Sequence, residues 1–262
     1  MDLENSSQPS SSEQRVRLDI CYHGANFCGW QIQPDQKSIQ GELMQAFSKL
    51  CDNEPRVIGA GRTDAGVHAH QQVAHVDLEN FDKRSKESWL NAINSLTDPN
   101  LWVTNIAVVE NDFHARFLPH TKTYQYHIEW SSYPNPFYAD RRFHLRTRHF
   151  KLELVKEFLK TVKGEHDFKN YCSINNATDT TIRTIVKSEL IHTDDHNFYF
   201  EFQGKGFLQH MVRILAGTAV YIGLERISLE TAIEALQKDD MRDQLGVTLP
   251  PHGLVLASTR YV

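Results

Sequence analysis

A short segment of the chain, residues 57–77, concentrates residue types that could do chemistry. In VIGAGRTDAGVHAHQQVAHVD, Arg62 and Asp64 stand two residues apart among glycines. If this segment is extended, both side chains point to the same face, because side chains alternate along a strand. A guanidinium beside a carboxylate keeps the carboxylate ionised when it is partly buried, and glycine lets the backbone approach a ligand closely. The spacing therefore indicates either a structural ion pair or a charged site that receives a ligand.

Three histidines follow this pair and open an alternative. Asp64 with His68, His70 and His75 could form the metal site of a hydrolase, since imidazole and carboxylate groups bind zinc. The segment lacks the Asp-His that would extend a dinuclear pattern, and fourteen histidines make chance pairs common, so surface or supporting histidines are the other interpretation. Nucleotide-binding loops are excluded, because Asp64 stands where a dinucleotide fingerprint needs glycine and a phosphate loop would need Lys-Ser/Thr in place of Val67-His68.

The stretch from Arg116 to Lys151 is a second chemical feature, in which basic residues are mixed with aromatic ones. It holds seven Lys/Arg against two acids, a net charge of +5, in a chain whose net charge is −5. Mixed basic and aromatic side chains suit phosphates and unstacked bases together, and a solvated basic face is the alternative. The candidates for phosphate contacts are Arg116, Arg141, Arg142, Arg146 and Arg148.

Composition narrows the class of protein. At 262 residues, with 40% apolar and 23% charged residues, we expect a globular chain of about one and a half to two domains. No run of about 18 apolar residues exists, so no membrane span is expected. Residues 1–14 are polar and acidic, which predicts a disordered tail on a cytoplasmic protein. The four cysteines show neither CxxC nor zinc-ligand spacing and are expected to be reduced thiols.

Hydrophobic periodicity predicts the elements that position these residues. In the first half these are a strand at 15–22, a helix at 38–51 with a possible cap at Ser38, strands at about 56–61 and 71–78, a helix carrying Trp89, Ile93 and Leu96, and a strand at 101–109. This β-α-β-β-α-β order is the ferredoxin-like split motif.

The same order repeats in the second half with insertions. Its predicted elements are a strand at 122–130, a helix at 151–162, a strand pair at 182–193 and 197–203, a helix at about 207–222, a helix from Ser228 and a strand at 253–262. We therefore expect an α+β fold, an α/β sandwich of two fused ferredoxin-like or RRM-like halves with antiparallel sheets packed side by side. The halves are predicted at residues 15–110 and 111–262.

The segment AGRTDAGVHA resembles the signature motif of the tRNA pseudouridine synthase A family. The resemblance covers nearly everything from about residue 15 to the end of the chain. Five further segments are similar to that family's other motifs in order, namely YHGANFCGWQIQP, FHARFLPHTKTYQY, GEHDFKNYC, GKGFLQHMVRILAG and PPHGLVLASTRYV. One departure is Gln71, which stands where the family usually has glycine.

The resemblance implies an isomerase that converts uridine to pseudouridine in the anticodon stem-loop of tRNA, at positions 38 to 40. It implies a homodimer that uses no cofactor and no metal. By motif position, Asp64 is implied as the catalytic nucleophile and Arg62 as its neighbouring arginine. Tyr124 is implied as the tyrosine that stacks on the target base, and Arg213 as the second arginine of the site.

Two mechanisms and one other function stay open at the level of sequence. Asp64 would either attack C1′ to form a glycosyl ester or remove the 2′ proton on a glycal route. Arg62 and Arg213 would hold the carboxylate charged and oriented, since a guanidinium can bind it with two hydrogen bonds. A non-catalytic RNA-binding module is the alternative, because ferredoxin-like halves resemble RNA-recognition sheets.

Overall fold

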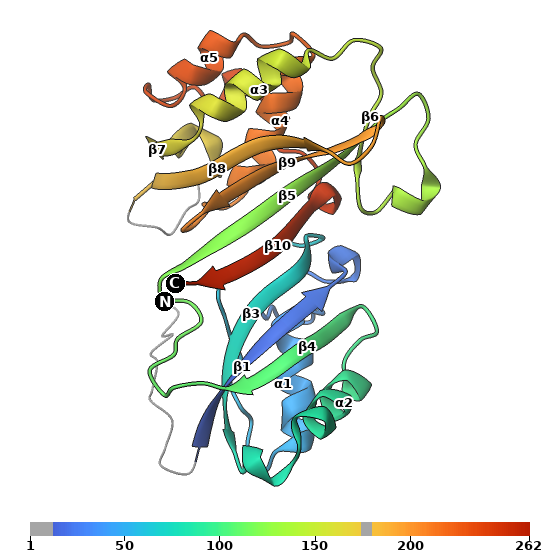
Figure 1. Ribbon diagram of the computed structural model, residues 1–262, viewed down its shortest axis with the longest axis vertical. Coiled ribbons are helices and arrows are strands. Elements are labelled where there is room, and N and C mark those ends of the chain that lie inside the picture. Colours follow the sequence, from blue (N-terminus) through green and yellow to red (C-terminus); the bar gives the residue numbers. More distant parts are fainter. Residues whose placement is uncertain (1–12, 174–179) are drawn as a thin grey trace. The chain divides into compact units, whose positions relative to one another are not determined.

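The computed structural model describes residues 13–173 and 180–262, which fold into two compact units (Figure 1). The first unit extends to Pro119 and also includes Tyr261, and the second unit begins at His120. Each unit combines helices with antiparallel strands, so the expected α+β class is confirmed. Within the described residues, no helix is long and apolar enough to cross a membrane.

The connection at residues 111–119, which the sequence assigned to the second half, clusters with the first unit. One contact behind this placement is the backbone N–H of Ala115, which donates to Nδ1 of His75 at 3.1 Å. Of the expected tail, residues 1–12 lie outside the described part of the chain. Residues 13 and 14 already belong to the first strand.

The first unit has the ferredoxin-like order of elements. They are β1 (Glu13–Tyr22), α1 (Ile39–Leu50), β2 (Ile58–Gly59), β3 (His68–Glu79), α2 (Lys86–Leu96) and β4 (Leu101–Val108). Its strands are ordered β4-β1-β3, with β2 on the other side of β3 and every pair antiparallel. This order is the one that a β-α-β-β-α-β chain adopts when its two halves interleave.

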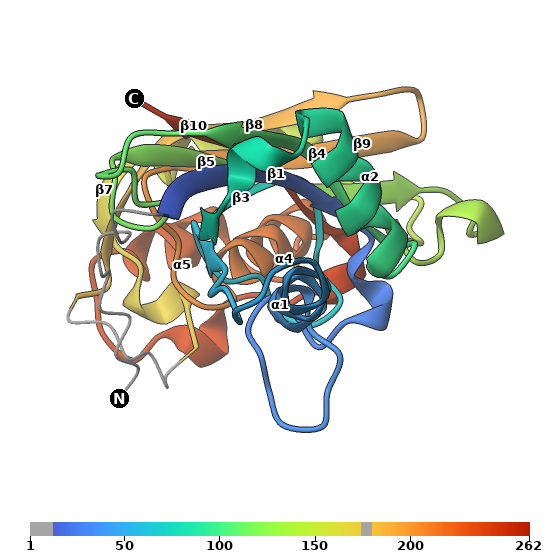
Figure 2. The ribbon, with the colours of Figure 1, turned by 90° about the horizontal axis from the view of Figure 1, so that it is seen from below.

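Alternating burial along β1 builds the core of this unit. Val16, Leu18 and Ile20 are fully buried, as are Leu43 and Phe47 of α1. Figure 2 shows α1 end-on, on one side of β1 and β3. Both helices begin with serine caps as the sequence predicts for α1: the side chains of Ser38 and Ser85 accept hydrogen bonds from the backbone N–H groups of residues 41 and 88.

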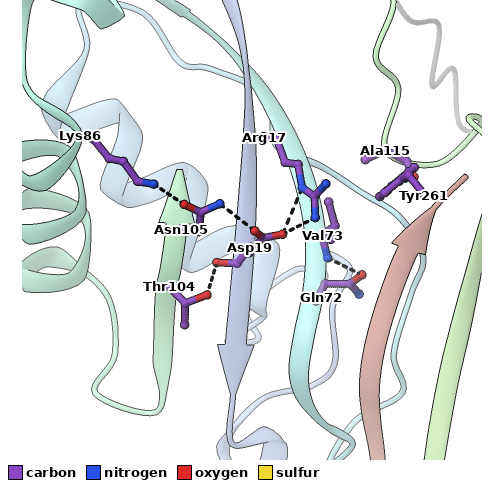
Figure 3. A network of polar contacts seen from close by, with 9 residues as sticks. All are labelled: Arg17, Asp19, Gln72, Val73, Lys86, Thr104, Asn105, Ala115 and Tyr261. Atoms are coloured by element: carbon purple, nitrogen blue, oxygen red, sulfur yellow. Dashed lines mark hydrogen bonds and ion pairs between the residues drawn. The ribbon is translucent and has the colours of Figure 1, made fainter. Parts of the chain in front are cut away.

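Polar side chains link β1 to its neighbours on the strand positions that alternate with the core residues (Figure 3). Arg17 donates to Asp19 at 2.7 Å, and Asn105 of β4 donates to the other carboxylate oxygen of Asp19 at 2.9 Å. Lys86 donates to Asn105, and the guanidinium of Arg17 lies 5.4 Å from the ring centroid of Tyr261. The buried Asp19 is thus compensated by several donors, which stabilises its burial.

The second unit repeats the order with two additional strands, β6 and β7, and one additional helix, α5. Its elements are β5 (His120–Trp130), β6 (Phe143–Leu145), α3 (Leu152–Thr161), β7 (Gly164–Asp167), β8 (Ile182–His192), β9 (Asn197–Gly204), α4 (Met211–Gly223), α5 (Leu229–Glu234) and β10 (Leu254–Tyr261). The strand order is β10-β5-β9-β8-β7, with β6 parallel to β5. Strands β10, β5, β9 and β8 therefore take the same relative places as β4, β1, β3 and β2 in the first unit.

Helix α4 begins later than its hydrophobic pattern predicts. The sequence indicates a helix from about residue 207, but the structure starts it at Met211. The cause is His210, whose φ of 60° lies in the left-handed region that a right-handed helix cannot contain. Residues 209 and 210 consequently form a turn that leads into the helix.

Candidate functional site

The loop that carries Arg62 and Asp64 joins β2 to β3 in the first unit. It contains neither helix nor strand, because β2 ends at Gly59 and β3 begins at His68. Backbone contacts hold it: Trp30 N–H donates to Thr63 O at 3.0 Å, and Val67 N–H donates to Asp64 O at 3.2 Å. The loop thus has a defined conformation without regular secondary structure.

The chain between β1 and α1 turns next to this loop, and its glycines let it lie directly against the loop. Gly29 has a φ of +106°, and a Cβ at this position would lie 2.6 Å from Thr63 O. A Cβ on Gly24 would collide with the carbonyl group of Val67. Both positions therefore require glycine, Gly29 for its backbone conformation as well as for the close approach.

The side chain of Thr63 sets the direction of its two charged neighbours. Thr63 is 6% exposed, and its hydroxyl lies 2.8 Å from the hydroxyl of Tyr22. Burial raises the pKa of Tyr22 above its usual range, so this phenol stays protonated as a hydrogen-bond partner. Arg62 is exposed and Asp64 is half-buried. The buried residue thus stands between two less buried charged residues, a burial pattern that fits alternating side chains along this segment.

Gln72 on β3 fixes the start of the loop. Its Nε2 donates to Gly61 O at 2.9 Å, and its Oε1 accepts from the backbone N–H of Val73 (Figure 3). Gln72 is fully buried, so both ends of the amide are used where water does not reach. The neighbouring Gln71, the residue that departs from the family pattern, is half-buried on the same strand.

The three histidines of the segment have different surroundings. His68 is buried, and its Nδ1 accepts from Gly24 N–H at 3.0 Å. His75 is also buried and accepts from Ala115 N–H; burial, with a smaller effect of nearby positive charge, lowers its pKa to about 3. His70 is exposed. In the described ranges, no group of three or more His, Cys, Asp or Glu residues is placed to hold a metal ion.

Tyr124 lies on β5 in the second unit, opposite Phe202 of β9. Its ring meets the ring of Phe207 edge-on, with centroids 5.2 Å apart and an interplanar angle of 85°. Tyr124 is 8% exposed, whereas Tyr126 is fully buried with its hydroxyl donating to Pro250 O at 2.8 Å. Of the two tyrosines in the YQY segment, Tyr124 is therefore the one that keeps some exposed surface.

Arg213 lies in the first turn of α4 and is half-buried. Its Nε donates to Leu249 O at 2.7 Å, and Leu249 N–H donates back to Arg213 O at 3.3 Å. The segment of Leu249 runs close to the helix because Gly217 and Gly246 meet there without side chains. This contact orients the guanidinium plane relative to α4.

The five phosphate-contact candidates are divided between the units. Arg116 is exposed in the first unit, and the others lie in the connection between β5 and α3. Arg141, Arg146 and Arg148 are exposed there. Arg142 is half-buried, with its guanidinium 3.7 Å from the ring centroid of Tyr138 and Nη1 donating to Asn197 at 2.6 Å, so it supports the connection itself.

Sequence reasoning missed the residues that hold the charged loop. Tyr22, Gly29 and Gln72 have no charge and stand outside the RTD segment, so no chemical pattern singled them out. The only available signal was the glycine and tryptophan of the CGWQ segment, a combination typical of a tight turn. The structure shows that this turn packs directly against the loop that carries Asp64.

Comparisons with known proteins show which family the chain resembles. A family model described as tRNA pseudouridine synthase matches residues 159–262. A tRNA pseudouridine synthase A of Lactococcus lactis is 35% identical over 248 residues, which cover 94% of this chain and 97% of that protein. A protein of the same name from Listeria monocytogenes is 36% identical over 252 residues, covering 94% and 99%.

One solved structure of a Cbf5-Nop10-Gar1 complex is a far weaker match. It shares 12% identity and a TM-score of 0.30 with the chain, and the match spans 93% of this chain and 56% of that one. A likeness of this size carries no argument about fold or function. The fold assignment rests instead on the strand order of each unit.

Proposed function

The chain belongs to the tRNA pseudouridine synthase A family, and we propose that Asp64 is the catalytic residue of its reaction. Members isomerise uridine to pseudouridine in tRNA: the bond between N1 and C1′ breaks, the uracil turns, and C5 bonds to C1′. The C5 proton leaves and N1 gains a proton, so no atom is added in total. The enzyme therefore needs a group that handles the sugar carbon or its 2′ proton rather than an oxidant or a donor of atoms.

The carboxylate of Asp64 can fill this role in two ways. It can attack C1′ and form a glycosyl ester, as carboxylates do in retaining glycosidases, or it can take the 2′ proton and give a glycal. The observation that supports the proposal is a half-buried carboxylate on a loop held by backbone contacts. A group held in this way loses little conformational freedom when substrate binds.

We propose supporting roles for three further residues, each argued within its own unit. Arg62 stands two residues before Asp64 in the same loop and is exposed, so its guanidinium would hold the carboxylate charged and oriented. The ring of Tyr124 would stack on the uracil once it leaves the RNA stack, and Phe207 supports that ring from its edge. Arg213 would bind an anionic group with the guanidinium that Leu249 orients.

The substrate region and assembly belong to the proposal as well. We propose that the target uridines lie at positions 38 to 40 of the anticodon stem-loop and that the enzyme works in the cytoplasm as a homodimer. One chain's basic stretch is small compared with an L-shaped tRNA, which favours two copies. Light scattering at micromolar concentration tests the assembly, and a monomer there would contradict it.

Release of tritium from C5-labelled uridine in an unmodified tRNA tests the activity directly. Wild-type enzyme should release tritium, and sequencing of the product should place pseudouridine within positions 38 to 40. A folded sample that binds tRNA without releasing tritium would identify a non-catalytic RNA-binding module instead. Activity abolished by a chelator would revive the metal-site interpretation of the histidines.

A further inference from the structure

The connection between β5 and α3 carries two aromatic rings that are largely exposed to solvent and do not contribute to the core. Tyr133 is 80% exposed and Phe137 is 85% exposed. Both lie in the segment that includes the short 3-10 helix Pro136–Tyr138. This segment extends outward from β5 and β6 in both views (Figures 1 and 2). Two large rings exposed within five residues of one short connection are candidates for an interaction surface.

A buried carboxylate fixes the conformation that exposes these rings. Glu129, at the end of β5, is 7% exposed, and both of its oxygens accept from Asn135 N–H, at 3.0 and 3.1 Å. The side chain of Asn135 then accepts from Phe137 N–H at 3.0 Å, and Ser131 donates to Tyr133 O at 2.7 Å. The rings are consequently held on a shaped backbone, which lowers the entropy lost when they bind.

The base of the connection is also fixed. The guanidinium of Arg142 stacks on Tyr138, and its backbone N–H donates to Tyr138 O at 2.9 Å. Tyr138 is therefore covered on one face, in contrast to Tyr133 and Phe137. This contact fixes the part of the connection that directly follows Phe137, while Tyr133 and Phe137 stay open to a partner that can stack on them.

Charge indicates the kind of partner. Residues 131–150 contain four arginines and one acid, Asp140, so the connection carries a net charge of +3 in a chain whose net charge is −5. A cationic segment with exposed rings suits a polyanion with unpaired bases, because arginine binds phosphate and aromatic rings stack on bases. An RNA with a single-stranded loop or end has both features.

We infer that Tyr133 and Phe137 stack on unpaired bases of the bound tRNA and form a second RNA-binding element in addition to the catalytic residues. This inference rests on the proposed function, since it takes tRNA as the partner. The arginines of the connection would hold the neighbouring phosphates. Stacking tolerates any base, so this element would add affinity without reading sequence.

Equilibrium binding to a labelled, unmodified tRNA tests the inference. We expect Tyr133→Ala and Phe137→Ala each to raise the Kd for tRNA about fivefold or more, the lower limit for loss of one stacked base. Tyr133→Phe and Phe137→Tyr keep a ring and should stay within about twofold of wild type. A blunt RNA duplex without unpaired bases should bind all of these variants about equally.

Trp102→Ala is the matched control, because Trp102 is an exposed ring (52%) on β4 of the first unit. It should leave the Kd for tRNA unchanged. Wild-type affinity in the double alanine variant, or an equal loss for the duplex, would overturn the inference. A double variant that becomes monomeric in light scattering would show that the rings contact a second copy of the chain.

Failure of the inference can be told apart from failure of the proposed function. If wild-type enzyme binds tRNA but releases no tritium, the proposed activity is wrong, and the comparison of Kd values still decides the stacking role. If tritium is released and the alanine variants bind tRNA like wild type, the inference alone is wrong.

Discussion

Asp64→Asn is the substitution that separates catalysis from folding and binding most cleanly. Asparagine keeps the size of the side chain and removes its negative charge, so it can neither form a glycosyl ester nor act as a base. The loop should keep its conformation, because contacts of its backbone remain: Thr63 O accepts from Trp30, and Gly66 N–H donates to Phe27 O at 3.3 Å.

The expected cost in stability is small. Asp64 is half-buried, and a partly exposed charge typically contributes about 1 kcal/mol or less. In a protein of this size, about 1 kcal/mol shifts Tm by roughly 2–4 °C. The expected loss of activity is far larger, at least about 1000-fold, which corresponds to about 4 kcal/mol in the activation barrier.

Single-turnover tritium release, with enzyme in excess over labelled tRNA, measures the chemical step. Asp82→Asn is the matched control, since Asp82 is an exposed acid of the first unit and should keep full activity. We expect the Asp64→Asn variant to bind tRNA about as tightly as wild type, because phosphates do not need a carboxylate. Turnover within about tenfold of wild type, a barrier change of only about 1.4 kcal/mol, would refute the assignment of Asp64.

Three other predictions follow from the contacts. Gly59→Ala places a methyl group against the Trp30 ring and should lower the free energy of unfolding by about 1–3 kcal/mol. Gly206→Ala is the control, because a methyl group has room there, and chemical denaturation measures both variants. In the folded protein the pKa of His75 is about 3, against an ordinary 6.5, so the unfolded chain binds the proton first as pH falls. The free energy of unfolding should therefore decrease as pH drops from about 6.5 toward 3, and it should decrease less steeply in the His75→Gln variant. Binding of tRNA should weaken with salt with a log–log slope of roughly −3 to −4, about 0.9 for each of four exposed arginines, and a flat profile would remove their assignment to phosphates.

Much of the fold could be predicted because its signals are local. Alternation in β1 and β5 and helical spacing in α1 and α3 lie within single elements, and the β-α-β-β-α-β order appears twice. The cap at Ser38 could also be predicted, because its side chain accepts a hydrogen bond from the backbone N–H only three residues later, at Gly41. These patterns fix the order of elements and, through it, the strand order of each unit.

The features that the sequence did not predict depend on contacts between distant residues. Strands β6 and β7 have three and four residues, too few for a period to show, and they exist through pairing with β5 and β8. The left-handed backbone of His210 is invisible in a hydrophobic pattern that continues through it. The predicted strand at residues 56–61 shortened to two residues, because the chain leaves β3 to form the loop of Asp64.

The arrangement around Trp30 explains why the charged segment needs its glycines. The Trp30 ring is 2% exposed and packs where a side chain on Gly59 would stand, and its backbone N–H holds Thr63 O. One residue thus contacts both the strand before the loop and the loop itself. Gly29, beside it, has the positive φ that lets the turn reach the backbone of Asp64. The two segments, far apart in sequence, therefore form one structural element, and the position of the Asp64 carboxylate depends on uncharged residues as much as on its own motif.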